Sequence, residues 1–452
     1  MTFPSTIPSK FLSAGNELGV VAVGFSGGQC KPGVDAAPTA LISAGLLTQL
    51  KEDLGYTLHH DDTVHNYSSL IPSSDPDYRN MKNPLAVSAV TKQLSNQVYE
   101  HAKYGRLVLT LGGDHSIAIG TIAGTSRAIK ERLGREMAVI WVDAHADINT
   151  PETSESGNIH GMPVAFLTGL AKEEKADMFG WLGEEKALSL KKLVYIGLRD
   201  IDRGEKKILR EHGIKAFSMH DIDKHGIGRV MEMALGHIGH DTPIHLSFDV
   251  DALDPQWAPS TGTPVRGGLT LREGDYIAEC VHETGSLVAM DLVEVNPSLE
   301  AVGAADTIRA GCSLFNARPM SISSPLPSKL MDPARLRPHH SSANSQSDDY
   351  ASDYQSSDDG YDYSIVDDAP EAQPTKAKKF KPAITSQASI EASASKGLED
   401  ADHAFTEIMP HIWQRHAGGR RAKIPEVDLD LEKGVSGGAA TDEKNHRRRP
   451  QR

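Results

Sequence analysis

The sequence predicts an α/β fold, a single domain with a central, mainly parallel sheet flanked by helices. Six short runs rich in Val, Ile and Leu are apolar almost without interruption, as expected for strands covered on both faces. Segments with apolar residues at helical spacing alternate with these runs, and this order favours parallel pairing. We therefore expect one α/β domain over residues 18–320, after a flexible N-terminus of residues 1–17.

The predicted strands are short and evenly distributed along this domain. In chain order they occupy 19–25, 106–111, 137–142, 192–198, 243–248 and 286–295. The clearest helical patterns occupy 38–55 and 272–285, each closed by a glycine that favours a helix end. A domain of roughly 300 residues is large for one core, but it is common among α/β enzymes.

The composition changes at about Ser321, and we expect residues 321–452 to form a low-complexity, disordered tail. The segment is rich in Ser, Asp and Pro and cannot bury enough apolar surface to offset its ordering entropy. A short amphipathic motif at 404–414 could dock on a protein partner, although Pro410 would weaken an isolated helix there. The basic runs of the tail could direct nuclear import or be simply solvated.

Composition also limits the class of protein. The formal charge of −14 argues against a general nucleic-acid binder but permits a cationic substrate. The three cysteines are widely spaced, which suits a reducing compartment rather than a disulfide framework. The N-terminus lacks a signal-peptide pattern, and no stretch has the roughly 20 apolar residues of a membrane span. We therefore expect a cytoplasmic protein without a nucleic-acid or membrane partner.

Polar motifs follow three of the predicted strands directly. They are GGDHS (112–116), DAHADIN (143–149) and DVDALDP (249–255). In an open parallel sheet, ligands bind outside the carboxyl ends of the strands, so these motifs can converge. If the chain stays extended beyond each strand, alternate residues point to the same side. The residues so brought together would be His115, Asp143, His145, Asp147, Asp249 and Asp251.

These six residues predict a metal site. A single Asp at a strand end is more often a helix N-cap, and a lone His is more often a satisfied polar residue. Several carboxylates in one crevice, however, repel one another and lose hydration, a conflict that cations remove. Carboxylate and imidazole ligands without a thiolate favour Mn²⁺, although Co²⁺, Ni²⁺ and Zn²⁺ are not excluded. Four Asp anions balance two divalent ions, which can activate water at neutral pH.

The sequence contains three further motifs: GLRDID before Gly204-Glu205, TGTPVRGGL and VEVNPSLE. Together with the three strand-end motifs, they resemble those of the arginase branch of the ureohydrolase family, and the resemblance runs from about residue 19 to 316. The resemblance implies two Mn²⁺ ions, commonly a homotrimer, and hydrolysis of L-arginine to L-ornithine and urea by a metal-bridging hydroxide. One ion would be bound by His115, Asp143, Asp147 and Asp249. The other would be bound by His145, Asp143, Asp249 and Asp251, so that Asp143 and Asp249 bridge the two.

The resemblance also implies contacts to both ends of the substrate. The α-carboxylate would be held by side chains that follow DI and lie in SESGN: Asn149, Ser154, Ser156 and Asn158. Ser154 stands where family members often carry Thr, and it keeps the hydroxyl group. The α-amino group would face Asp202, with Glu205 close by, and Thr263 would lie over the guanidinium. The implied catalytic residues are His160 as proton shuttle, Glu294 as guanidinium partner and the metal ligand Asp147.

Three alternatives remain at this stage. Another ureohydrolase, such as agmatinase or guanidinobutyrase, would share the metal site but lack the need to bind an α-carboxylate. A histone-deacetylase-like enzyme of the same fold would use one zinc, which His145 and Asp251 speak against. A non-catalytic interaction protein would act through the tail, although all six ligands are retained.

Overall fold

The structure is a computed structural model that describes residues 8–172, 175, 178–183, 186–299 and 301–315. The first seven residues and the predicted tail with its motif at 404–414 lie outside the described residues. The fold given below therefore concerns the predicted catalytic domain.

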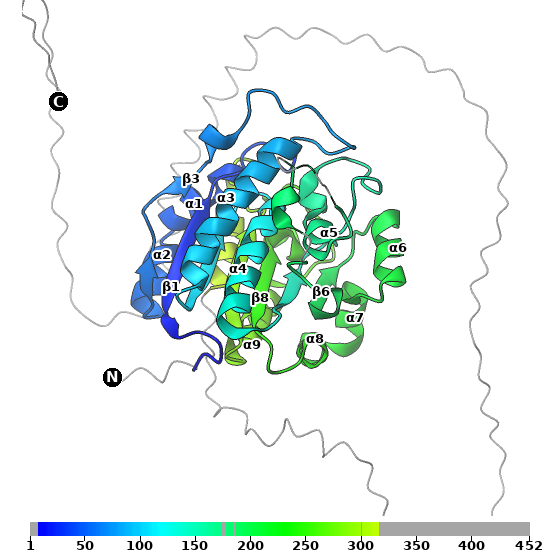
Figure 1. The fold of residues 1–452 in the computed structure, drawn as a ribbon. Helices are drawn as coiled ribbons and strands as arrows, with labels where there is room; N and C mark the ends of the chain where they lie inside the picture. The colour runs from blue at the N-terminus through cyan, green and yellow to red at the C-terminus, as the bar shows by residue number, and fades with distance from the viewer. Residues whose placement is uncertain (1–7, 173–174, 176–177, 184–185, 300, 316–452) are drawn as a thin grey trace, which may run out of the picture. The chain divides into compact units, whose positions relative to one another are not determined.

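The centre of the domain is one parallel sheet (Figure 1). Its order is β2-β1-β4-β9-β8-β5-β6-β7, with β3 also paired to β1, and every pairing between these strands is parallel. The strands are β1 (Ala14–Val23), β2 (Thr57–His59), β3 (Val64–His65), β4 (Arg106–Leu111), β5 (Ala138–Val142), β6 (Leu193–Leu198), β7 (Lys215–Ser218), β8 (Ile244–Asp249) and β9 (Leu287–Val293). The predicted fold class is confirmed.

All six predicted strands are present, and they form the six adjacent central positions from β1 to β6. The sequence did not predict β2, β3 and β7, which lie toward the edges. These strands have two to four residues and are only partly buried. Their side chains therefore lack the continuous apolar run by which the central strands were recognised.

Helices cover both faces of the sheet and complete two apolar cores. One face carries α3 (Pro84–Ala102), α4 (Ala118–Leu133) and α5 (Pro163–Thr168), whose apolar side chains join the first core. The opposite face carries α1 (Ala37–Ser43), α8 (Ile227–Ile238), α9 (Leu271–Glu283) and α10 (Ala301–Ser313). Along β5, Val139 and Trp141 enter the first core, whereas Ile140 and Val142 enter the second. Both strand faces are thus buried.

The helix predicted over 38–55 is interrupted. After α1 the chain turns at Gly45, whose φ of 95° lies in the left-handed region. It continues as the short α2 (Leu46–Thr48) and a π-helical turn, Gln49–Asp53. Glycine takes this conformation at little steric cost. The remaining described α-helices are α6 (Arg203–Glu211) and α7 (Met219–His225).

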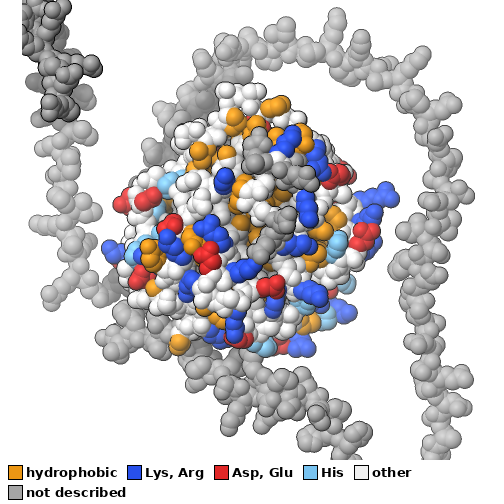
Figure 2. Space-filling view, viewed as in Figure 1, with side chains coloured by type: hydrophobic (Ala, Val, Ile, Leu, Met, Phe, Trp, Pro, Cys, Tyr) orange, Lys and Arg blue, Asp and Glu red, His pale blue; other side chains and the backbone are white. Residues whose placement is uncertain are grey.

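Charged side chains of both signs are interspersed over the face that Figure 2 shows, with apolar side chains scattered between them. None of the described helices is long and apolar enough to cross a membrane.

Candidate metal centre and substrate site

The predicted metal ligands and Glu294 follow four adjacent strands of the sheet, in the order β4, β9, β8 and β5. His115 follows β4, Glu294 follows β9, Asp249 ends β8 and Asp143 follows β5. Because these strands are parallel, their carboxyl ends lie at one edge of the sheet. The edge therefore brings together residues that are up to 179 positions apart, as in the hydrogen bond between the His115 amide and Glu294.

The chain turns rather than continuing extended at each of these strand ends. At three of them an aspartate accepts a hydrogen bond from the amide two residues later: Ser116 N to Asp114 (2.9 Å), His145 N to Asp143 (2.7 Å) and Asp251 N to Asp249 (2.8 Å). Such side-chain turns are favoured by Asp. Asp147 has a φ of 48°, and residues Val250–Ala252 form a 3-10 turn. The expected extended conformation is thus wrong, although its consequence, convergence of the side chains, holds.

A first group of ligand atoms surrounds the imidazole of His115. Its Nδ1 lies 3.1 Å from Asp143 Oδ2 and 3.2 Å from both Asp147 Oδ2 and Asp249 Oδ2. An octahedral divalent ion with bonds of about 2.1 Å keeps neighbouring ligand atoms about 3.0 Å apart. The buried Nδ1 makes no hydrogen bond of acceptable geometry with these oxygens. The spacing therefore fits coordination of a shared ion.

A second group lies on the other side of Asp143. His145 Nδ1 is 3.3 Å from Asp143 Oδ1 and 3.1 Å from Asp251 Oδ2, which also accepts a hydrogen bond from Thr263 Oγ1 at 3.0 Å. Asp143 thus turns one carboxylate oxygen toward each histidine. Within the described residues, only two groups bring three ligating side chains within 4.8 Å of one another: His115–Asp143–Asp147 and Asp143–His145–Asp251. Two ions that share Asp143 suit this arrangement, whereas a bridging role for Asp249 stays a prediction.

Electrostatics favours cations at the same place. Burial and the neighbouring Asp143 carboxylate raise the pKa of Asp147 to about 6. Burial, with Asp251 and Asp143 nearby, raises the pKa of Asp249 well above its usual range. Both shifts express the free-energy cost of holding several carboxylates in a dry crevice. Divalent cations would remove that cost, so the residues present fit a binuclear metal site.

Two further residues support the ligands, and the sequence analysis did not identify them. The Trp141 ring stacks on the His115 ring at a centroid distance of 4.0 Å, and its Nε1 donates to Asp143 Oδ2 at 2.9 Å. Ser247 Oγ lies 2.9 Å from His115 Nε2, which leaves Nδ1 for an ion. Each supporting residue lies two positions before a ligand on its strand, hence on the same face. That spacing was the signal available in the sequence.

Replacing Trp141 by Phe tests this support. Trp141→Phe keeps an aromatic ring beside His115 but removes the N–H group that orients Asp143. Changes to groups that orient metal ligands commonly lower metal affinity by about 10- to 100-fold, and we expect a loss in this range. Calorimetric titration of the metal-free protein with Mn²⁺ measures it. Unchanged affinity would show that the indole N–H does not orient the carboxylate.

Glu294 has one engaged and one unpaired carboxylate oxygen. Its Oε1 accepts a hydrogen bond from the His115 amide at 3.0 Å and lies 3.0 Å from His160 Nδ1. Its Oε2 is buried without a hydrogen-bond partner. Burial disfavours the charged form of His160, but the hydrogen bond to Glu294 and its charge outweigh this effect and raise the pKa of His160 to about 9. Glu294 also has a φ of 62°, an unfavourable conformation that often occurs at functional sites.

The residues predicted to bind the amino-acid end lie beside the metal ligands. Asn149 Nδ2 donates to Asp202 Oδ2 at 2.8 Å, so the residues predicted for the α-carboxylate and the α-amino group are in contact. Both oxygens of the buried Glu205 are engaged by backbone amides, those of Ile148 (3.1 Å) and Asp202 (3.0 Å). Glu205 therefore holds the segments of Ile148 and Asp202 together.

Three more predicted contacts occupy the loop that precedes His160. Ser154 Oγ accepts a hydrogen bond from the Gly157 amide at 3.0 Å, and Ser156 Oγ accepts one from the Asn158 amide at 3.2 Å. Ser156 is exposed, and Asn158 is half-buried. Their side chains are thus accessible at the rim of the candidate site.

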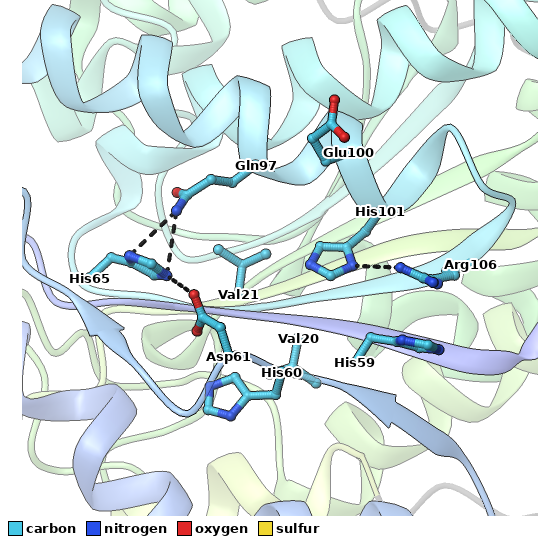
Figure 3. A pocket seen from close by; sticks show the side chains of 10 residues that line it. All are labelled: Val20, Val21, His59, His60, Asp61, His65, Gln97, Glu100, His101 and Arg106. Carbon is cyan, nitrogen blue, oxygen red and sulfur yellow. Dashed lines mark hydrogen bonds and ion pairs between the residues drawn. The ribbon is translucent and has the colours of Figure 1, made fainter. Parts of the chain in front are cut away.

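A second cluster of histidines lies in a cavity of about 410 Å³ between α3 and the segment that contains β2 and β3 (Figure 3). The cluster includes His101, which lies beside Arg106 at the start of β4. His115, by contrast, follows the opposite end of that strand. His65 lies 3.0 Å from Asp61 and is also within 3.4 Å of Gln97. No three ligating side chains of this cavity meet the spacing found at the strand ends. The cavity is therefore not a second candidate metal centre by this geometry.

Comparison with known proteins agrees with this geometry. The family model described as the arginase family matches residues 16–318. Among curated relatives, the arginase of Neurospora crassa is 79% identical over 313 residues, covering 69% of this chain and 87% of the relative. The arginase of Emericella nidulans is 76% identical over 317 residues, covering 70% and 98%.

Solved structures give the same result. The cold-adapted arginase of Glaciozyma antarctica is 44% identical, with a TM-score of 0.55 over 69% of this chain and 97% of that one. The Entamoeba histolytica arginase solved with L-ornithine is 30% identical, with a TM-score of 0.60 over 70% and 100%. The extent of the match, at these identities, establishes that the chain belongs to the arginase family.

Proposed function

We propose that this protein hydrolyses L-arginine to L-ornithine and urea at a binuclear manganese centre. The observation that carries the proposal is the pair of ligand groups that share Asp143, together with the buried carboxylate of Glu294, whose Oε2 has no hydrogen-bond partner. The high identity to several arginases supports the choice of reaction. The ornithine complex of the Entamoeba enzyme, which has the same fold, supports an amino acid as ligand.

The metal ligands would be His115, Asp143, Asp147 and Asp249 for one ion, and His145, Asp143, Asp249 and Asp251 for the other. When bound, two divalent ions lower the pKa of a water molecule, which provides a nucleophile at neutral pH, and stabilise negative charge that develops during hydrolysis. Oxygen-rich ligation with two imidazoles and no thiolate supports manganese over zinc.

Glu294 would bind and orient the guanidinium group. A planar guanidinium presents parallel N–H donors that suit a carboxylate, and the unpaired Oε2 supplies an acceptor. Thr263, which donates to Asp251, would fix the loop over this end of the substrate. His160, held against Glu294, would carry a proton between solvent and the leaving amine. Glu294 would therefore have a second function, which is to hold His160 at the reacting end of the substrate.

The amino-acid end of the substrate would be recognised by two sets of groups. Asn149, Ser154, Ser156 and Asn158 offer amide and hydroxyl hydrogen bonds to the α-carboxylate. Asp202 offers a carboxylate to the α-amino group, and Glu205 holds Asp202 in place. Agmatine lacks the carboxylate, so it would leave these polar groups without partners.

A urea-release assay with Mn²⁺ on L-arginine and agmatine tests the proposal. We expect arginine to be preferred by at least about a hundredfold in kcat/KM, because unpaired polar groups in a binding site strongly disfavour the smaller analogue. Chelation should abolish the activity, and Mn²⁺ should restore it better than Zn²⁺. Equal use of both substrates would identify a different ureohydrolase.

We also propose that the protein is a homotrimer in the cytoplasm. Membership of the arginase family supports the trimer, and the three free cysteines, Cys30, Cys280 and Cys312, suit a reducing compartment. The molar mass in solution would test the assembly.

A further inference from the structure

A strained turn at residues 78–81 borders the loop that carries three predicted α-carboxylate contacts. Tyr78 and Met81 exchange two backbone hydrogen bonds of 3.0 and 2.8 Å. The central residues, Arg79 and Asn80, have φ values of 47° and 60°, the pattern of a type I′ turn. Asn tolerates this left-handed conformation better than most residues, whereas Arg does not. The turn is thus maintained against the local preference of its sequence.

The side chain of Asn80 ties this turn to the carboxylate loop. Its amide Nδ2 donates to the carbonyl oxygen of Ser154 at 2.7 Å and to that of Pro151 at 3.3 Å. The backbone carbonyl oxygen of Asn80 is so close to Gly157 that a Cβ atom there would approach it to 2.4 Å. The Lys82 amide adds a hydrogen bond of 2.9 Å to the Gly157 carbonyl. The turn therefore contacts both ends of the loop.

The loop is held by its own backbone only in its first half, where the Thr153 and Ser154 amides donate to the Thr150 carbonyl oxygen. Residues 151–158 contain no helix or strand, and Glu152, Glu155 and Ser156 are exposed. Within the loop, the Ser154 and Ser156 hydroxyls bond only to amides two or three residues ahead. Contacts from outside the loop therefore contribute to the position of its carboxylate-binding groups, and the Asn80 amide supplies two of these contacts.

We propose that Asn80 is a positioning residue for amino-acid recognition, which acts by fixing the loop 151–158 relative to the metal centre. It would not touch the substrate. Its loss would weaken the binding of ligands with an α-carboxylate while the reacting end stays intact. This inference rests on the proposed function, whose carboxylate contacts it explains.

Calorimetric binding to the Mn²⁺-loaded protein tests the inference without relying on turnover. The probes are L-ornithine and putrescine, which differ only in the α-carboxylate. Two variants remove the amide donors: Asn80→Gly keeps the left-handed backbone accessible, and Asn80→Asp keeps the side-chain shape. We expect each to bind ornithine about tenfold more weakly, as the loss of two hydrogen bonds that hold the loop predicts, with putrescine binding unchanged. The KM for arginine should rise similarly, with kcat within about twofold.

Asp62→Gly provides a control, because Asp62 is another left-handed residue, with a φ of 57° and a side chain that is 98% exposed. It should bind ornithine as the wild-type protein does. Wild-type ornithine affinity in both Asn80 variants, or an equal loss for ornithine and putrescine, would overturn the inference. Ornithine binding that is weakened in the Asn80 variants, combined with a wild-type protein that releases no urea from arginine, would instead refute the proposed function and leave the inference standing.

Discussion

Replacing Asp143 by Ala should abolish both metal occupancy and urea release. Asp143 directs one oxygen toward His115 at 3.1 Å and the other toward His145 at 3.3 Å, so its loss removes a ligand from both groups. Changes to groups that only orient metal ligands lower metal affinity by about 10- to 100-fold. Removal of a ligand shared by both metal groups should therefore lower turnover more than about a thousandfold. Metal analysis of the purified protein and the urea assay measure the two effects.

Two further variants make the Asp143 result specific. Asp143→Ala also leaves the Trp141 indole and the His145 amide without their acceptor, which costs about 1–3 kcal/mol for each buried donor. Asp143→Asn retains a carbonyl oxygen and should lose the metals while remaining folded. Asp254→Asn, in the same motif as Asp249, alters a side chain that accepts bonds from Gln256, Gly267 and Gly268 and should keep both metals. Two retained ions with near-normal turnover in Asp143→Ala would refute the shared-ligand assignment.

Replacing Glu294 by Gln should disable the enzyme while leaving the metals bound. Gln keeps the shape and an acceptor for the His115 amide, but it removes the charge that would pair with the guanidinium. Breaking a buried ion pair by removing one partner costs about 3–5 kcal/mol. The expected fall in kcat/KM for arginine is therefore roughly 10²- to 4 × 10³-fold, because each 1.4 kcal/mol is about tenfold.

The metal content distinguishes this effect from damage to the centre. Glu294→Gln should bind two ions per subunit, in contrast to Asp143→Ala. Glu273→Gln, which changes only the capping box of α9, should keep normal turnover and serves as the matched control. A Glu294→Gln enzyme within threefold of wild-type kcat/KM would show that another group binds the guanidinium.

The central strands could be predicted because strands buried on both faces appear in the sequence as nearly continuous apolar runs. Strands such as β5 and β8 are buried on both faces, and apart from the site residues and His245, which pairs with Asp291, their positions are apolar. The edge strands β2, β3 and β7 lie partly in solvent, and their stability comes from neighbours that are distant along the chain. The helix over 38–55 was predicted too long because periodicity alone does not register the left-handed turn at Gly45.

For the candidate site, the types of ligand and the edge of the sheet at which they meet could be predicted from the sequence. Residue chemistry and parallel topology sufficed, since both follow from local patterns. Three features become visible in the folded chain alone: Asp143 lies between two histidines, Trp141 donates to Asp143, and Ser247 contacts His115. The tertiary structure alone connects Asn80 to Ser154, 74 positions away. Such contacts depend on loop turns and side-chain directions, which no short-range periodicity encodes.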